Sequence, residues 1–178
     1  NPDHPTGIRV RPITADDLDA AADRWLEEVR WDAQFGSATE RPSTLGAVRR
    51  ELTGLVARDQ PWTWVTETAA GTTAGTTGGE LTGLVVVSPP DRAEWIANLT
   101  CAAPVAYLSC LVVSAGRRGG GVGAALVRQA HAALDAAGVN VTLLHYAALN
   151  PLSGPFWHRC GYRPLWTIWH ARPASELR

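Results

Sequence analysis

The chain has 178 residues, the usual size of one compact domain, and can bury a core without disulfides or a structural metal. Apolar residues make up 46% of it and charged residues 19%, which excludes a disordered chain. The net charge of −1 gives no reason to expect a nucleic-acid partner, and no apolar run approaches the roughly 20 residues that cross a bilayer, so no membrane partner is expected.

The first third of the chain predicts one strand and two helices. Residues 8–12 form the expected first strand. Thr14, with Asp17 three positions later, fits a short capping box at the start of a helix. Apolar side chains recur at helical spacing over residues 18–30 and again over residues 45–56, so both segments are predicted to be amphipathic helices.

Two predicted strands follow, separated by a segment of low complexity. Residues 62–68 and 81–87 are rich in Val, Trp and Thr, which favour the pleated surface of a sheet. Residues 69–79 between them are almost entirely Gly, Thr and Ala, so we expect a mobile hairpin loop. Residues 91–104 are predicted to be irregular, and residues 1–6 to be a flexible extension.

The second half of the chain is patterned more clearly. A strand is predicted over residues 106–113, and a helix over residues 122–137 that ends at Gly138. Another strand is predicted over residues 141–146, and a short helix over residues 150–159. A final strand is predicted over the segment that Trp166 opens and Arg172 ends. The order β-α-α-β-β-β-α-β-α-β indicates an α+β fold with a mixed sheet, in a single domain over residues 1–178.

A glycine-rich loop lies between a predicted strand and a predicted helix. Residues 116–121 hold two arginines and four glycines directly before the helix. A helix N-terminus attracts anions through its unpaired N–H groups, and glycines let the backbone approach a phosphate closely. A Walker site requires a lysine, and the chain has none. A dinucleotide fingerprint would need an acidic residue about 20 positions later, which is missing.

Residues 118–123 (RGGGVG) fit the pattern R/Q-x-x-G-x-G/A, and in this they resemble the acetyl-CoA loop of the GCN5-related N-acetyltransferases (GNAT). A second match lies downstream, where Asn150, Ser153, the pair 156–157 (FW) and residues 161–164 (GYRP) are similar to a later segment of that family. The order of elements also matches along nearly the whole chain. The resemblance implies a mixed sheet of about six to seven strands flanked by about four helices.

The resemblance also implies acetyl-CoA as co-substrate. In this family, two neighbouring strands separate after a bulge and the pantetheine arm lies in the gap. Asn150 could equally cap the helix beside Pro151, and Phe156 could be ordinary core. The positions that match the family's cofactor site are Leu111, Val112, Val113, Arg118, Gly119, Gly120, Gly121, Val122, Gly123, Ala124, Asn150, Ser153 and Phe156.

The implied reaction is attack of a small-molecule amine on the thioester. Transfer to a protein amine, use of a longer acyl chain, and a non-catalytic CoA-binding module or half of a tandem protein stay open as alternatives. Trp157 stands where the family usually has an acidic Tyr, and an indole N–H is no useful acid. Tyr107, Ser109 and His145 are the weaker catalytic candidates that remain, and each could instead be structural.

The acceptor side is predicted to involve Trp25, Glu28, Trp31 and Trp95. Eight tryptophans are many for this length, and most of them must belong to the core. An acidic side chain could bind a cationic amine, although it could also be a solvated helix residue. Three scattered cysteines show no zinc spacing, so we expect no metal and a cytoplasmic protein with reduced thiols. A homodimer is possible on family grounds.

Overall fold

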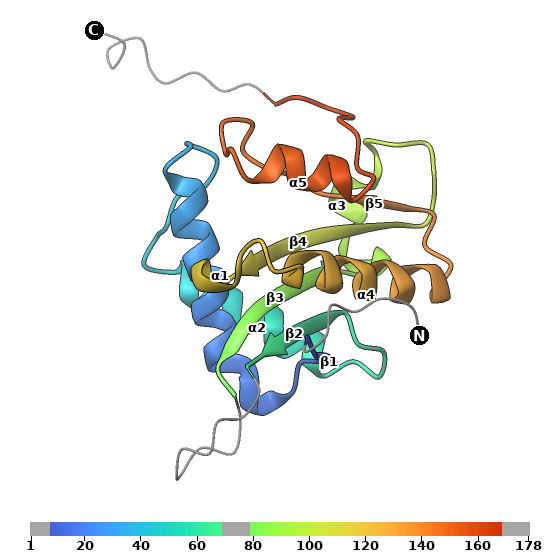
Figure 1. The fold of residues 1–178 in the computed structure, drawn as a ribbon. Helices are drawn as coiled ribbons and strands as arrows, with labels where there is room; N and C mark the ends of the chain where they lie inside the picture. Colours follow the sequence, from blue (N-terminus) through green and yellow to red (C-terminus); the bar gives the residue numbers. More distant parts are fainter. Residues whose placement is uncertain (1–7, 69–78, 169–178) are drawn as a thin grey trace, which may run out of the picture.

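The computed structural model describes residues 8–68 and 79–168. They form one five-stranded sheet in the spatial order β1-β2-β3-β4-β5 (Figure 1). The first four strands pair antiparallel, and β5 pairs parallel to β4. The sheet is therefore mixed, as predicted. The strands are β1 Val10–Pro12, β2 Thr63–Glu67, β3 Leu81–Ser88, β4 Val105–Val113 and β5 Val141–Leu143.

Helices cover both faces of this sheet. Helices α1 and α2 pack against each other on one face, while α4 crosses the opposite face (Figure 1). A Cβ atom at Gly83 of β3 would lie 2.9 Å from Leu126 and 3.0 Å from Val122, so α4 is seated directly on that glycine. The helices are α1 Leu18–Ala33, α2 Thr44–Val56, α3 Glu94–Ala97, α4 Val122–Ala136 and α5 Ser153–Arg159, with short 3₁₀ turns η1 Ala15–Asp17, η2 Pro90–Arg92 and η3 Ala115–Arg117.

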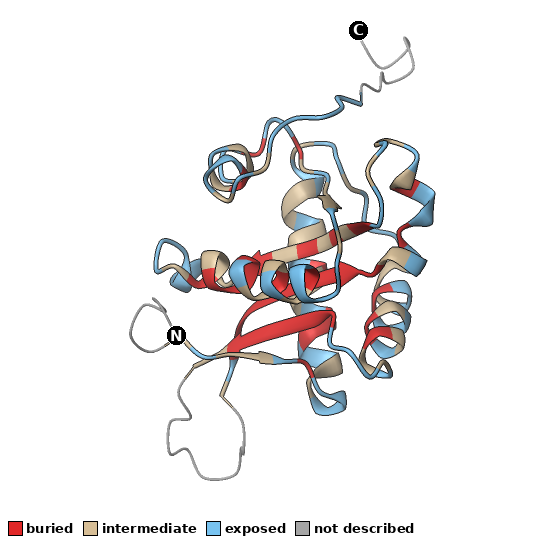
Figure 2. Ribbon diagram, turned by 90° about the vertical axis from the view of Figure 1, so that its right-hand side faces the viewer, coloured by how far each residue is buried: buried red, intermediate tan, exposed pale blue. Residues whose placement is uncertain are grey.

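The core is centred on β3. All eight residues of this strand are buried, because α4 covers one face and α1 with α2 cover the other. This explains why four apolar residues follow one another at 84–87, since a strand that is buried on both faces does not alternate. Trp62 and Trp64 on and beside β2 are buried as well. Figure 2 shows the buried strands lying between the helical layers.

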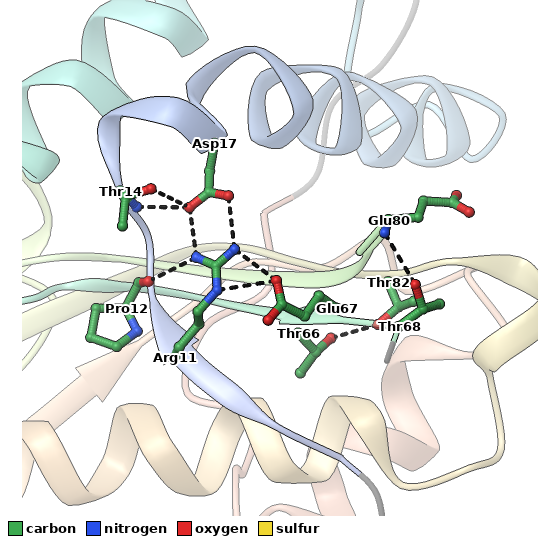
Figure 3. Close-up of polar contacts among 9 residues, drawn as sticks. All are labelled: Arg11, Pro12, Thr14, Asp17, Thr66, Glu67, Thr68, Glu80 and Thr82. Atoms are coloured by element: carbon green, nitrogen blue, oxygen red, sulfur yellow. Dashed lines mark hydrogen bonds and ion pairs between the residues drawn. The ribbon is translucent and has the colours of Figure 1, made fainter. Parts of the chain in front are cut away.

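The entry into α1 is held by the predicted capping box of Thr14 and Asp17 and by an arginine that the sequence analysis does not single out. The Asp17 carboxylate accepts hydrogen bonds from the backbone N–H and the hydroxyl of Thr14, both at 2.8 Å (Figure 3). The Arg11 guanidinium joins this group to the sheet: it donates to Asp17 at 2.6 and 2.9 Å and to Glu67 of β2 at 2.9 and 3.2 Å. One arginine therefore fixes where α1 begins relative to the first two strands.

The structure differs from the sequence-based expectation in several elements. The described residues form five strands rather than six to seven, and five α-helices rather than about four. The fifth strand ends at Leu143 rather than at 146, and α5 begins at Ser153 rather than at 150. The segment 91–104 is not wholly irregular, because it contains the end of η2 and all of α3.

The predicted final strand is absent over residues 166–168, the part of it that the structure describes. The Trp166 indole instead donates a hydrogen bond to the Leu99 carbonyl at 2.8 Å, and the side chains of Leu165 and Ile168 are exposed. The rest of this strand, the extension at 1–6 and all of the loop at 69–79 except Gly79 lie outside the described residues. Within the described ranges, no helix is long and apolar enough to span a membrane.

Replacement of Arg11 by Ala is expected to lower the free energy of unfolding by about 1–2 kcal/mol, because Asp17 and Glu67 lose their shared cation. Arg11 lowers the pKa of Asp17 from 3.8 to about 2, so this stabilisation is present at neutral pH and lost as the pH falls toward 2. Urea unfolding of parent and variant at several pH values measures it. Arg9→Ala, an exposed neighbour, is the control, and an equal loss there would contradict the assignment.

Candidate active site

A β-bulge in β4 shapes the site. Val86 of β3 pairs with Cys110 and Val87 pairs with Leu108, which leaves Ser109 as an extra residue in β4. Tyr107 pairs with Ser88. Because Val86 and Ser88 point to the same face of the sheet, the bulge places Tyr107 and Cys110 on one face although they are three residues apart. This is the face that α1 covers.

Strands β4 and β5 separate just before the bulge. Their pairing covers only Val105 to Tyr107, so the edge of β4 beyond Tyr107 has no strand beside it among the described residues. Ser114 donates its N–H to Thr82 at 2.9 Å, and hydrogen bonds alternate along an antiparallel pair. The main-chain groups of Leu111 and Val113 therefore point away from β3, toward the gap. Arg118 Nε donates a hydrogen bond to the Val113 carbonyl oxygen at 3.2 Å.

The gap opens into a cavity of about 440 Å³. Its walls come from four places: α1, the edge of β4, the glycine loop with the first turn of α4, and the end of β5 with α5. The lining residues include Glu28, Trp31, Asp32, Ser109, Leu111, Val113, Arg117, Arg118, Gly119, Gly121, Gly123, His145, Tyr146, Asn150, Ser153 and Phe156.

The glycine loop has a backbone that requires glycine. Gly119 and Gly121 have φ angles of +78° and +84°, a left-handed region that other residues enter only with strain. Gly121 is the N-cap of α4, so the unpaired N–H groups of the first helical turn lie at the cavity. At Gly123 a Cβ atom would lie 3.2 Å from the Phe156 ring, which shows how closely α5 approaches this turn.

Arg118 ties the loop to α1. Its guanidinium lies over the Trp31 ring, 5.0 Å from the ring centroid, a cation–π contact. Arg117 lines the same cavity. The loop end of the cavity therefore combines two cationic side chains with helix N–H groups, which is the chemistry that binds a phosphate.

A pair of carboxyl groups lies on the α1 wall. Glu28 and Asp32 are one helical turn apart and both line the cavity. Asn150 Nδ2 donates to Asp32 at 3.0 Å, while the Asn150 side-chain oxygen accepts from the Leu152 N–H at 3.1 Å. Burial raises the pKa of Glu28 to about 8, and the neighbouring Asp32 carboxylate adds to the rise. Glu28 therefore keeps its proton until the pH approaches about 8.

A second cavity of about 510 Å³ lies beyond the bulge. Ser109 lines both cavities, and its hydroxyl forms a 2.8 Å hydrogen bond with that of Ser88. Tyr107 lines the second cavity, and its hydroxyl lies 3.1 Å from Nδ1 of His145, which lines the first. Burial, and then the charge of Glu28, raise the pKa of Tyr107 to about 12, so its phenol stays neutral.

The structure gathers most of the predicted site residues around these two cavities. Every predicted cofactor residue except Gly120 lines the first cavity, as do Ser109, His145, Glu28 and Trp31. Tyr107, Trp25 and Trp95 line the second. Trp157 also lines the first cavity, but it is largely buried, with its ring edge-on to those of Phe156 and Tyr162.

The Asn150 side chain lines the first cavity and already forms hydrogen bonds there: its amide N–H donates to Asp32, and its oxygen accepts from the Leu152 N–H. The N-cap of α5 is Leu152 rather than Asn150. Arg117, one of the two arginines of the glycine loop, and Asp32, an acidic side chain near the end of α1, also line the first cavity. Tyr146 lines it as well, although no motif in the sequence predicts it as a site residue. The described residues contain no group of three or more His, Cys, Asp or Glu side chains that could hold a metal ion.

Two glycines of the loop provide a matched test of its geometry. A Cβ atom would meet nothing within 4 Å at Gly116 or at Gly119, but only Gly119 has a positive φ. Gly119→Ala is expected to destabilise the protein by about 1–2 kcal/mol through backbone strain. Gly116→Ala is expected to be neutral or to stabilise it by about 0.5 kcal/mol. Denaturant unfolding compares the two, and equal effects would refute the left-handed assignment.

Several solved structures share the fold at low sequence identity. An aminoglycoside N-acetyltransferase, AAC(6′)-Iy in complex with CoA, is 14% identical with a TM-score of 0.66 over 96% of this chain and 99% of that chain. AAC(6′)-Ig from Acinetobacter haemolyticus is 15% identical with a TM-score of 0.64 over 93% and 97%. A chain of the NatC complex bound to Gag peptide and CoA is 16% identical with a TM-score of 0.62 over 87% and 84%.

The sequence comparisons add the family. No curated protein sequence matches the chain significantly. The sequence profile described as Acetyltransferase (GNAT) family matches residues 26–162, which include α2, every strand except β1, the glycine loop and α5. The match covers well over half of the chain and every residue that lines the two cavities except Trp25. The chain therefore belongs to the GNAT acetyltransferase family.

Proposed function

We propose that this protein is an N-acetyltransferase that uses acetyl-CoA and acetylates the amine of a small molecule. The observation that supports this most directly is the unpaired edge of β4, which begins beside the phosphate-binding loop and ends at the bulge. An extended polar chain with a phosphate at one end fits this edge as an added strand.

The residues present fit acetyl-CoA. The first turn of α4, with Gly119, Gly121 and Arg118, would hold the pyrophosphate. The Leu111 N–H and C=O and the Val113 N–H would pair with the amides of the pantetheine arm, because these groups face the gap. Phe156 and Ser153 of α5 would close the arm from the other side. Acetyl-CoA supplies an activated thioester, so the protein needs to supply position and a proton acceptor.

We assign the proton acceptor to Glu28. The ammonium group first loses one proton to become a free amine, whose nitrogen then bonds to the thioester carbonyl carbon. The C–S bond breaks to release the thiolate, and the nitrogen loses a second proton, which balances the proton that the thiolate takes up. A primary amine with a pKa near 10.4 is almost wholly protonated at neutral pH. Glu28 with Asp32 attracts the ammonium and, when ionised, takes its proton. Tyr146, a phenol in the same cavity, is our candidate to protonate the leaving thiolate in place of Trp157.

The second cavity has room for a small-molecule acceptor. It is an open depression with a volume of about 510 Å³, within the range of small-ligand pockets. A peptide amine is the second candidate, since a chain of the peptide-bound NatC complex has the same fold. A panel of small amines and peptides, assayed by thiol release from acetyl-CoA, separates the two. A cytoplasmic location and a homodimer stay predictions.

Saturating acetyl-CoA is expected to raise the melting temperature by several degrees, since a ligand at about 100 times its Kd adds about 2.7 kcal/mol to stability. Arg118→Ala is expected to weaken CoA binding about tenfold through loss of a charge-assisted contact to phosphate. Arg9→Ala, exposed and outside both cavities, serves as the control. If Arg118→Ala binds CoA as tightly as the parent, the assignment of the glycine loop to the pyrophosphate is wrong. If acetyl-CoA does not raise the melting temperature, the proposed function is wrong.

Glu28→Gln is expected to lower kcat/KM by about 100-fold or more by removal of the general base. In the parent, kcat/KM should rise with pH as Glu28, with its pKa of about 8, loses its proton. Measurement with two acceptor amines of different pKa assigns this rise in kcat/KM to the enzyme. A rise caused by Glu28 occurs at the same pH for both amines and is missing in Glu28→Gln.

Stability gives an independent readout on Glu28, whose charge is faced by Asp32 on α1 and by Tyr107 and Cys110 on β4. The folded-state pKa is raised from 4.5 to about 8, so the parent loses stability as the pH rises through that interval. Glu28→Gln should lack this loss. An unchanged pH dependence of unfolding, or of kcat/KM, would contradict the assignment.

A further inference from the structure

The second cavity has an aromatic wall built from three elements. Trp25 comes from α1, Trp95 from α3 and Tyr107 from β4. The rings of Trp95 and Tyr107 meet edge to face, with centroids 5.0 Å apart. Trp95 is nevertheless 62% exposed, which is unusual for the largest apolar side chain. A ring that is held in place and still open to solvent is suited to contact a ligand.

The charges in this cavity cancel. Glu51 and Arg92 are the only charged side chains among the described residues that line it, and they form an ion pair at 3.0 Å. A polycationic acceptor such as an aminosugar needs several free carboxylates, and this wall offers none. The cavity therefore favours an acceptor whose body is uncharged and flat, because such a body gains ring-to-ring contacts without losing solvation of a charge.

The aromatic wall lies next to the proposed proton acceptor. Trp25 and Glu28 are three residues apart on α1, so their side chains are neighbours on the helix surface. On β4, Tyr107 and the bulge residue Ser109 lead from the second cavity into the first. The charge of Glu28 reaches Tyr107 strongly enough to raise the pKa of its phenol. One ligand can thus place a ring in the second cavity and an ammonium group beside Glu28.

Given the acetyl transfer proposed above, we propose that the second cavity binds the acceptor and that the acceptor is a primary amine carrying an aromatic ring on a short alkyl chain. The ring lies among Trp25, Trp95 and Tyr107, and the ammonium group faces Glu28 and Asp32. The thioester approaches the bulge from the opposite end, along the edge of β4.

Calorimetric titration tests the acceptor class without the need for turnover. Phenethylamine, cyclohexylethylamine and kanamycin are titrated into the protein with saturating CoA, and kcat/KM is measured for each with acetyl-CoA. Phenethylamine is expected to bind about fivefold or more tightly than the other two, because only its ring is aromatic. It should also have the highest kcat/KM.

Substitutions at Trp95 then identify the wall. Trp95→Ala is expected to weaken phenethylamine about tenfold and to leave the affinity for CoA unchanged, while Trp95→Phe keeps most of the binding. The exposed position of Trp95 makes unfolding of these variants a small risk, and melting curves check it. Leu165→Ala removes a comparably exposed apolar side chain outside both cavities and should change neither affinity.

The outcomes separate this inference from the function on which it rests. If CoA binds and kanamycin or cyclohexylethylamine is preferred, the aromatic acceptor is wrong and the acetyltransferase stands. A Trp95→Ala variant with parent-like phenethylamine affinity also overturns the acceptor site. If acetyl-CoA neither binds nor releases thiol with any amine, the proposed function fails first and the inference fails with it.

Discussion

One extra residue in β4 determines how this site can be built. A strand without a bulge would keep alternate side chains on alternate faces and would continue its pairing with β5. With Ser109 inserted, Tyr107 and Cys110 both face α1, and the pairing to β5 stops at Tyr107. The bend produces two results at once: a free strand edge on one side of Ser109 and an aromatic-walled cavity on the other. Neither would exist in a regular five-stranded sheet.

A free strand edge inside a protein is costly unless something pairs with it, because unpaired backbone groups that leave water lose hydrogen bonds. Arg118 offsets part of this cost, because its Nε donates a hydrogen bond to the Val113 carbonyl. The same guanidinium packs on Trp31, so the loop, the strand and α1 share one cation. The other edge groups stay in contact with the cavity. A strand-like ligand that pairs with this edge would satisfy the backbone groups that folding leaves without a partner.

The sequence predicts the parts of this arrangement that repeat locally. Helical periodicity predicts α1, α2 and α4. The glycines before Val122 predict the loop, because other residues adopt the φ angles of 119 and 121 only with strain. Local sequence patterns do not predict the structure where contacts between residues far apart in the chain determine it. Residues 144–146 read as strand, yet the bend in β4 takes away their partner. The Asp32–Asn150 hydrogen bond joins residues 118 positions apart, and no spacing rule predicts it.

The order of chemistry along α1 and β4 gives the site a direction. At one end Arg117, Arg118 and the α4 N-terminus concentrate positive charge, which suits a phosphate. In the middle, Glu28 and Asp32 place two carboxyl groups side by side, and burial raises the pKa of Glu28. An ammonium group bound there would have a partner that can hold it and, once ionised, accept its proton. At the far end the charges of Glu51 and Arg92 cancel, and three aromatic rings form one wall. An anionic donor is repelled from the carboxyl pair and attracted by the arginines, whereas a cationic acceptor experiences the reverse. For the proposed reaction, this order of charge would favour entry of the two substrates from opposite ends, with the reacting groups meeting at the bulge.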